Sequence, residues 1–195
     1  NNKSFVIDIG SNDGTFLSFF KNKGIKVLGI DPAYAIARTA TKNGIETWPE
    51  FFNQKLIPQI KERNKNVSLV SANNVFAHCD DLRGMVECVR SILSPNGVFV
   101  FEVSYLGAIY ENTLFDTIYH EHLAYHSVIP LVSFFEIHKM ELFSVQKIKS
   151  HGGSIRGMVK LRDGNHKADG SVKSLIAFEK KLALNQPKTW LNFAD

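Results

Sequence analysis

The sequence has 195 residues, of which 44% are hydrophobic and 22% are charged. This composition excludes a disordered chain and suits one α/β domain with a full hydrophobic core. The formal net charge of +4 is spread along the sequence without a basic block, which argues against nucleic-acid binding and only weakly favours an anionic small molecule.

The cysteines and the hydropathy of the sequence indicate in which cellular compartment the protein is expected. Cys79 and Cys88 are the only cysteines, and their spacing fits neither a disulfide framework nor a zinc site. No stretch reaches the roughly 20 apolar residues of a membrane span, and the first residues run into a strand rather than a signal peptide. We therefore expect a cytoplasmic monomer or weak dimer with reduced thiols, bound to neither membranes nor nucleic acid.

The apolar pattern predicts strands and helices in alternation. Strands are expected at residues 5–9, 27–30, 45–47, 67–71, 98–103, 142–147 and 155–160. A first helix runs through Phe16 and Phe20 to Gly24, and further helices are expected at 33–43, 81–93 and 128–140, with a turn at 94–97. The last two strands fit a hairpin, so the sequence predicts a seven-stranded, mostly parallel sheet with a C-terminal antiparallel hairpin and helices on both faces.

The same pattern suggests how the chain divides. Residues 1–163 are expected to form the α/β domain, and a lone charged helix at 169–184 follows with little chain after it. We interpret residues 164–195 as a connector helix that leads to a further domain absent from this sequence.

The turn after the first strand, GSNDG at residues 10–14, is the first candidate binding feature. Its glycines permit positive φ and close approach of a ligand. Asp8 and Asp31 lie at or just beyond the ends of the first two strands and can accept hydrogen bonds, the latter from a ribose diol. A dinucleotide site would read G-x-G-x-x-G, whereas Asn12-Asp13 here suits a cofactor without a pyrophosphate. The alternative is an ordinary turn capped by Asp13.

Two further segments follow strands at the expected ligand edge of the sheet. Aromatic residues in WPEFF, at 48–52, could stack on a planar base, although simple core packing of these side chains is at least as favoured. Ligands sit at the carboxyl ends of strands beside the switch point of an open α/β sheet, which strands one and four flank. Asn74 and His78, which follow the fourth strand one helical turn apart, can therefore face the cleft together.

The stretch DTIYHEHLAYH, residues 116–126, has the highest density of proton-transfer groups in the chain. It holds three of the seven histidines and two of the five tyrosines. Histidine is suited to general-base catalysis because its ordinary pKa lies near neutrality. Two alternatives stand beside this reading: a metal site with H-x-H-x3-H spacing, or a polar helix start whose histidines are simply hydrogen-bonded.

Taken together, the motifs carry a family resemblance. The D-x-G-x-x-x-G spacing in IDIGSNDGTFL and the run LSPNGVFVFE resemble class I methyltransferases. With GIDPA, SANNVFAH, FDTIYHEHLAYHS and HGGSIR, the chain resembles the C-methyltransferases that act on nucleotide-linked keto-deoxysugars, over residues 5–195. The resemblance implies an N-terminal zinc-binding domain and a C-terminal Rossmann-like domain on either side of a central one, and we expect this sequence to correspond to the central domain alone.

The resemblance implies a cofactor, S-adenosyl-L-methionine, with S-adenosyl-L-homocysteine as product, and zinc only in the absent N-terminal domain. It implies that His122 is the general base, Glu121 a substrate or orienting contact, and Tyr119 a donor near the developing oxyanion. Asn74 and His78 match positions that face the sugar. The cofactor is expected to contact Asp8, Gly10, Asn12, Gly14, Asp31, Pro32, Phe52 and Asn73. No metal ligand is expected.

The remaining residues of the motifs are expected to be structural. His120 is predicted to be dispensable, Tyr125 and His126 to support the stretch, and the 151–153 turn to be structural with a substrate-loop role open. The expected activity is C-methylation of a nucleotide-activated keto-deoxysugar through an enolate, and flanking domains are expected to complete the substrate site. The alternatives are O- or N-methylation of another small molecule, and a non-catalytic cofactor-binding module.

Overall fold

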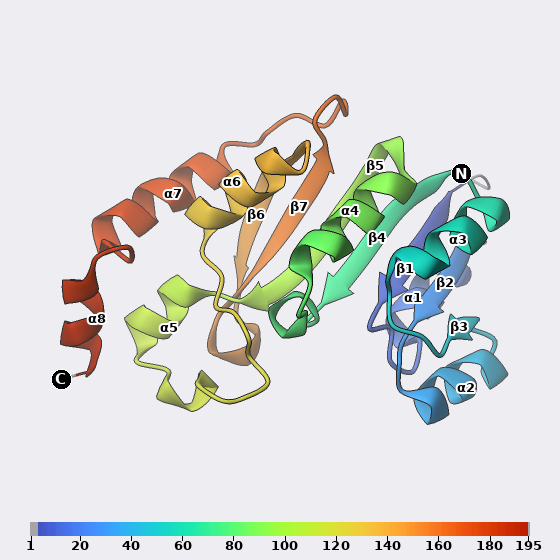
Figure 1. The fold of residues 1–195 in the computed structure, drawn as a ribbon, viewed down its shortest axis with the longest axis horizontal. Coiled ribbons are helices and arrows are strands. Elements are labelled where there is room, and N and C mark those ends of the chain that lie inside the picture. Colours follow the sequence, from blue (N-terminus) through green and yellow to red (C-terminus); the bar gives the residue numbers. More distant parts are fainter. Residues whose placement is uncertain (1–3, 195) are drawn as a thin grey trace.

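The computed structural model describes residues 4–194. Its strands are β1 (Phe5–Ile9), β2 (Lys26–Ile30), β3 (Thr47–Trp48), β4 (Val67–Asn73), β5 (Leu93–Ser104), β6 (Met140–Ile148) and β7 (Ser154–Leu161). They form one sheet in the order β3-β2-β1-β4-β5-β7-β6 (Figure 1). β1 to β5 pair in parallel, whereas β7 is antiparallel to both β5 and β6. The predicted seven-stranded sheet with a closing hairpin is confirmed.

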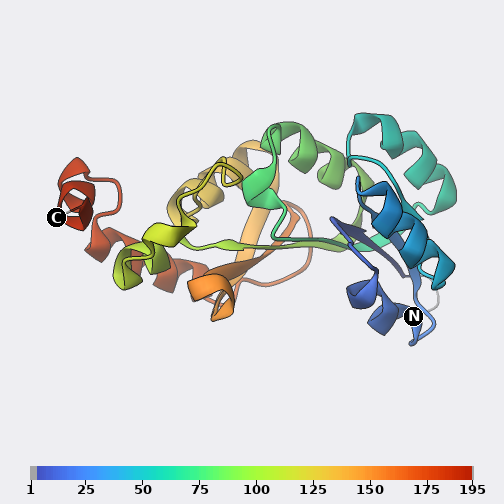
Figure 2. The ribbon, with the colours of Figure 1, turned by 90° about the horizontal axis from the view of Figure 1, so that it is seen from below.

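Helices cover both faces of this sheet. They are α1 (Thr15–Lys21), α2 (Tyr34–Lys42), α3 (Ile57–Arg63), α4 (Leu82–Ile92), α5 (Leu106–Asn112), α6 (Val128–Ile137), α7 (Ser171–Leu182) and α8 (Pro187–Ala194). Figure 2 shows α1 on one side of the sheet and α3, α4 and α6 on the other. Within residues 4–194, every helix is too short or too polar to cross a lipid bilayer.

Alternation along β1 distributes its side chains between the two layers. All five of its residues are buried, as expected for a central parallel strand. Val6 packs with Leu17 of α1 in a small cluster, while Ile7 belongs to the main core with Ile60 of α3. This double burial fixes the register of β1, and therefore the position of the turn at its carboxyl end.

Two strand predictions need correction. The short third strand lies at Thr47–Trp48 rather than at 45–47, because Ile45 is buried under α1 instead. The turn expected at 94–97 belongs to β5, where the register shifts from Val67↔Leu93 to Leu69↔Val98. Residues 94–97 of β5 are therefore more numerous than the β4 residues opposite them, and they form a bulge within a continuous strand. Only the pairing with β4 distinguishes this bulge from a turn.

The predicted helix 128–140 ends earlier than expected. Lys139 adopts a φ of 57°, and its N–H donates to the carbonyl oxygen of Glu136 at 3.0 Å. This left-handed residue ends α6 and allows Met140 to pair with Leu161 as the first residue of β6.

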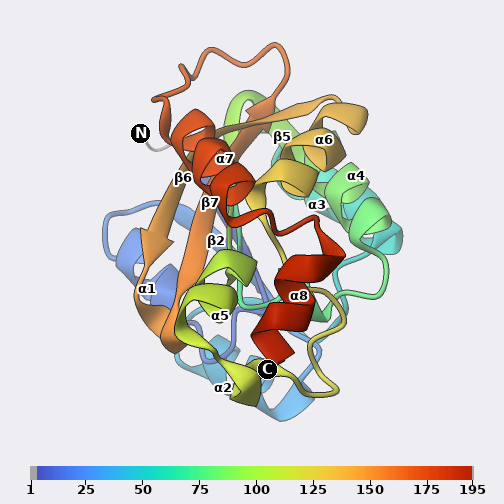
Figure 3. The same cartoon turned by 90° about the vertical axis from the view of Figure 1, so that its left-hand side faces the viewer.

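The C-terminal part of the chain contains two helices instead of the predicted lone helix. Glu179 of α7 is buried and accepts hydrogen bonds from the N–H groups of Val128 and Ile129, at 2.5 and 2.9 Å. It thereby caps the N-terminus of α6, a favourable place for a carboxylate. Figure 3 shows α5, α7 and α8 together at one end of the molecule. The role of residues 164–195 as a connector stays a prediction.

Candidate active site

The turn at residues 10–14 lies at the carboxyl end of β1 and is shaped by left-handed backbone. Gly10, Asn12 and Gly14 have φ values of 69°, 50° and 81°. A Cβ atom on Gly10 would lie 2.4 Å from Cγ2 of Val75, and one on Gly14 would lie 2.8 Å from Cβ of Ile45. Glycine is therefore required at both ends of the turn by conformation and by space.

Asp31 ties this turn to the end of β2. Its carboxylate is 9% exposed and accepts hydrogen bonds from the N–H of Asn12 and of Ala33, each at 2.9 Å. Pro32, between them, is exposed. The carboxylate thus orients the turn, and a ribose contact by Asp31 would add to these bonds; that contact stays a prediction.

Asp8 is a buried carboxylate near the carboxyl end of β1, just before the turn at residues 10–14. It is 3% exposed, and Ser71 of β4 donates a hydrogen bond to its carboxylate at 2.7 Å. Burial raises the pKa of Asp8 to about 6; the Ser71 bond opposes this change and the charge of Asp31 adds to it. Direct contact of so buried a group with a ligand remains a prediction.

The end of β4 supplies the next candidates. Asn73 is half-buried and pairs with Glu102 of β5, and Asn74 then turns the chain with a φ of 55°. The N–H of Asn74 donates to the carbonyl oxygen of Glu102 at 2.9 Å. Phe52 packs against the main core and faces a hollow between α3 and α4. These contacts agree with the core-packing alternative, and stacking of Phe52 on a planar base stays a prediction.

The stretch predicted to be reactive lies between α5 and α6 and is mostly irregular. Its backbone is held to the residues after β4: the N–H of Leu123 donates to the carbonyl oxygen of Ala77 at 3.1 Å. The Nδ1 of His78 lies 2.6 Å from the carbonyl oxygen of Glu121. Because a carbonyl only accepts, His78 donates through Nδ1. Two segments far apart in the sequence, the residues after β4 and those around Glu121, are therefore brought together.

His122 is oriented by two hydrogen bonds. Its Nδ1 lies 2.9 Å from the carbonyl oxygen of Thr117 and must donate to it. In the neutral ring Nε2 then carries the lone pair, and it lies 3.1 Å from the hydroxyl of Tyr119, which donates to it. Tyr125 also donates to the Thr117 carbonyl oxygen, at 3.1 Å. The arrangement fixes the tautomer in which Nε2 is the basic nitrogen.

A cavity of about 310 Å³ lies over these groups. Four of the predicted site residues line it: Asn74, His78, Tyr119 and His122. Val103 and Ala77 form apolar parts of its wall. The cavity therefore combines a basic nitrogen, several donors and an apolar floor, which is the composition expected of a small-molecule site.

Other lining residues were not predicted as ligand contacts. They are Ser104, Asp116, Thr117 and His151. Ser104 ends β5, so the rule that ligands bind at the carboxyl ends of strands could have found it. His151 was interpreted as part of a structural turn with a substrate-loop role left open, since the His-Gly-Gly pattern alone is also typical of a turn.

Glu121 and His126 lie apart from this cavity. The side chain of Glu121 is exposed and is not among the lining groups, whereas its carbonyl holds His78. His126 is 7% exposed and its ring packs against Phe76 with centroids 5.3 Å apart. Residues 4–194 contain no group of three or more potential ligands placed to bind a metal ion. The catalytic role proposed for Glu121 stays a prediction.

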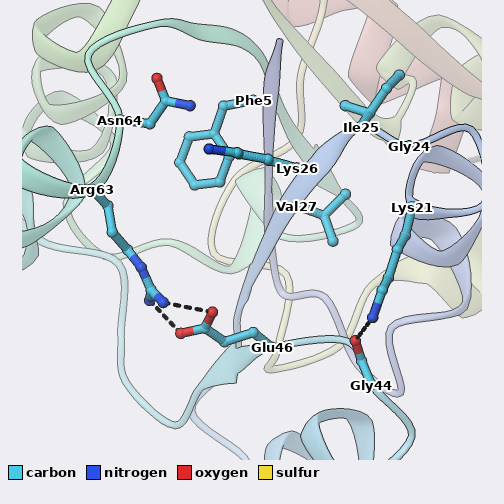
Figure 4. A pocket seen from close by; sticks show the side chains of 10 residues that line it. All are labelled: Phe5, Lys21, Gly24, Ile25, Lys26, Val27, Gly44, Glu46, Arg63 and Asn64. Atoms are coloured by element: carbon cyan, nitrogen blue, oxygen red, sulfur yellow. Dashed lines mark hydrogen bonds and ion pairs between the residues drawn. The ribbon is translucent and has the colours of Figure 1, made fainter. Parts of the chain in front are cut away.

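A second, larger cavity of about 600 Å³ lies at the opposite edge of the sheet (Figure 4). It is formed at the amino ends of β1 and β2 by Phe5, Ile25 and Val27, and Glu46 in its wall is paired with Arg63. None of the predicted site residues lines it. In doubly wound sheets the binding edge is that of the carboxyl ends, so size alone does not make this cavity the site.

Comparisons with known proteins bear on this geometry. A family model described as a methyltransferase domain matches residues 1–142. The chain is 34% identical over 189 residues to the C-methyltransferase NovU of Streptomyces niveus, an alignment that covers 97% of this chain and 45% of that protein. The chain spans under half the length of the three curated relatives that it matches.

Solved structures show the same fold. A SAM-dependent methyltransferase from Anabaena variabilis superposes with a TM-score of 0.63 at 15% identity, over 83% of this chain and 79% of that one. Magnesium protoporphyrin IX methyltransferase from Synechocystis with bound SAH gives a TM-score of 0.57 at 13% identity, over 80% and 73%. The predicted class I Rossmann-like methyltransferase fold is confirmed.

Proposed function

The chain belongs to the methyltransferase domain family, and we propose that its specific reaction is methylation of a carbon atom in a nucleotide-activated keto-deoxysugar. As a member of this family it is an S-adenosylmethionine-dependent methyltransferase domain. The observation that carries the proposal is the Nε2 atom of His122, a basic nitrogen held at the wall of the cavity. The similarity to a C-methyltransferase supports carbon as the acceptor.

The residues at the carboxyl ends of β1 and β2 fit the cofactor. The left-handed turn at 10–14 has glycine at both ends, where Val75 and Ile45 leave no room for a Cβ atom, and it lies at the carboxyl end of β1, where ligands bind in sheets of this kind. Asn12 and Asp31 present an amide and a carboxylate suited to a nucleoside with ribose hydroxyls. When bound there, S-adenosylmethionine supplies an electrophilic methyl group to the acceptor carbon and leaves as S-adenosylhomocysteine.

The chain's own residues would generate the carbon nucleophile. His122 takes the proton from the carbon next to the ketone, and the C–H electron pair becomes the enolate double bond while the carbonyl electron pair moves to oxygen. In the structure Nε2 already accepts the Tyr119 hydroxyl hydrogen, so this hydroxyl must turn away before the proton is taken. Tyr119 is 44% exposed and is free to reorient when a substrate enters.

Solvent exchange tests the reaction type. The full-length protein is incubated in deuterated water with a nucleoside-diphosphate keto-deoxyhexose and S-adenosylhomocysteine, and deuterium at the α carbon is followed by NMR. We expect exchange without methylation, and a branched sugar once S-adenosylmethionine replaces the product. An enzyme that methylates a hydroxyl or amine through His122 would neither exchange the α proton nor form a branched sugar.

A non-catalytic cofactor-binding module is the second candidate. It would bind S-adenosylhomocysteine in calorimetry but would neither exchange nor methylate any keto sugar. Calorimetry and exchange on the same preparation therefore separate the two functions.

A further inference from the structure

The loop between β6 and β7 brings an additional histidine to the cavity. His151 lines it together with His122 and Asn74, although it follows them by many residues in the sequence. Its φ is 50°, and the next two residues, Gly152 and Gly153, also have positive φ values of 77° and 134°. Positive φ is uncommon for residues other than glycine, so a third glycine would satisfy this backbone with less strain. The backbone conformation therefore does not explain why this position carries a histidine.

The loop is held firmly on both sides of this histidine. Glu102 is buried and accepts hydrogen bonds from Ser150 at 2.8 Å and from Arg156 at 2.9 Å. A Cβ on Gly153 would lie 2.5 Å from Cβ of Ala108, so the loop packs closely on α5. A side chain carried by so constrained a loop is presented in a defined place, which is what a binding group needs.

The chemistry of the site leaves a position for this side chain. An enolate is stabilised by hydrogen-bond donors at its oxygen, and more than one donor can act there. The donor expected from the sequence, the Tyr119 hydroxyl, is bonded to the base in the structure and can serve only after it has reoriented. The described residues that line the cavity include no lysine or arginine. Within residues 4–194 the ring of His151 has no hydrogen-bond partner of its own, so its N–H is available to a ligand.

We propose that His151 is a further substrate-binding residue of this site, which donates a ring N–H to the ketone oxygen of the substrate while His122 removes the α proton. The inference rests on the proposed function. The N–H stabilises the negative charge that develops on this oxygen, and no other co-reactant is involved.

Two substitutions separate the side chain from the backbone. His151→Gly removes the ring and relieves the left-handed residue, so a purely structural role predicts unchanged or raised thermal stability and unchanged chemistry. His151→Gln keeps a side-chain N–H but shortens and redirects it. His120→Gln is the matched control, because His120 is an exposed histidine of the same region that does not line the cavity.

The measurement is α-proton exchange in deuterated water by the full-length protein with S-adenosylhomocysteine present, using a nucleoside-diphosphate keto-deoxyhexose. Loss of one oxyanion donor is expected to slow exchange by about tenfold or more in His151→Gly, with a smaller loss in His151→Gln. The melting temperature of His151→Gly should equal or exceed that of wild type, the affinity of each variant for S-adenosylhomocysteine should match wild type, and His120→Gln should exchange normally.

Exchange by His151→Gly within twofold of wild type would overturn the inference while leaving the proposed function intact. Failure of the wild-type protein to exchange the α proton would overturn the proposed function, and this inference with it. The wild-type measurement alone therefore distinguishes the two failures.

Discussion

The turn at residues 10–14, proposed to bind the cofactor and called the cofactor turn below, and the reactive segment at 116–126 are both irregular, yet they are held in different ways. In the turn, backbone bonds to backbone or to a buried carboxylate: the N–H of Gly10 donates to the Ile30 carbonyl oxygen at 2.8 Å, and that of Asn12 donates to Asp31. In the segment, the ring of His122 bonds to the Thr117 carbonyl group, and the ring of His78, which follows β4, bonds to the Glu121 carbonyl group.

The difference matters for interpreting substitutions. The turn offers its shape to a ligand. That shape is held by backbone, by Asp31, and by local bonds in which Asn12 and Asp13 accept from the N–H groups of Asp13 and Thr15. In the reactive segment the candidate chemical groups are also the supports, so one substitution can disturb reactivity and structure together. Variants in the two regions should therefore produce different combinations of lost activity and lost stability, and four predictions test this.

The largest effect is expected from His122→Ala, which removes the proposed base. Turnover should fall by about 100-fold or more, the usual contribution of a positioned general base. Affinity for S-adenosylhomocysteine, measured by calorimetry, should remain within twofold of wild type because the cofactor turn does not contact this ring. A parallel loss of cofactor affinity would instead assign His122 a structural role.

Gly10→Ala should damage the turn through its backbone. The new Cβ would lie 2.4 Å from Cγ2 of Val75, and the alanine would have to keep a φ of 69°. The free energy of unfolding should therefore fall by about 3 to 4 kcal/mol, and cofactor binding should weaken. Gly24→Ala is the matched control: its φ is 74°, but no atom lies within 4 Å of the new Cβ. Chemical denaturation of both variants separates strain from steric overlap, and equal losses would exclude the overlap with Val75.

His126 should make the reactive segment sensitive to acid. Burial lowers the pKa of His126 from its ordinary 6.5 to about 4. The folded state favours the neutral ring of His126. The free energy of unfolding is therefore unaffected by this group above pH 6.5, and it decreases as the pH falls towards 4, by about 3 kcal/mol in total.

His126→Leu should abolish that loss, whereas His120→Leu, at an exposed histidine, should keep it. Unfolding free energies at pH 7.5 and 4.5 provide the measurement. A wild-type acid response that survives in His126→Leu would contradict this origin.

Asp8 should give the cofactor region the opposite response. Burial raises its pKa from 3.8 to about 6, so its contribution to folding is complete below pH 3.8 and is lost as the pH rises to about 6. Asp8→Asn should therefore gain stability relative to wild type on going from pH 4 to pH 8, by about 2 to 3 kcal/mol. Calorimetric unfolding at both pH values measures this, and a difference that does not change with pH would be inconsistent with a buried titrating Asp8.

The fold was predictable where local pattern and tertiary pairing agree. FVIDI reads as a buried strand and forms one, and the first and fourth strands are neighbours, as expected on either side of the switch point. The pattern failed at residues 94–97, because Pro95 and Gly97 are typical turn residues and only the pairing of Leu93 with Val67 keeps β5 continuous. The helix at Pro187–Ala194 was missed for a similar reason, since its aromatic residues pack on α5, far away in the sequence.

The site was predictable to the extent that its residues are close in sequence. The density of histidine and tyrosine at 116–126 indicated a reactive segment, and Tyr119 and His122 do meet. The sequence could not reveal that the tyrosine hydroxyl bonds to the proposed base, because this depends on a carbonyl that orients the ring. Nor could it place His151 beside them, since a loop after another strand must fold back to do so.

The stacking of Phe115 on Phe193 has a consequence for the order in which the protein is made. The two ring centroids lie 5.2 Å apart with planes 5° from parallel, and they join the residue just before the reactive segment to α8. Synthesis proceeds from the N-terminus, and a nascent domain can fold only with what has left the ribosome. Ile45 and Val75, which lie against the glycines of the cofactor turn, emerge early, whereas Phe193, which stacks on Phe115, is among the last residues described. In a ribosome-bound chain, the turn proposed to bind the cofactor should therefore become ordered well before the segment that carries the proposed general base, His122.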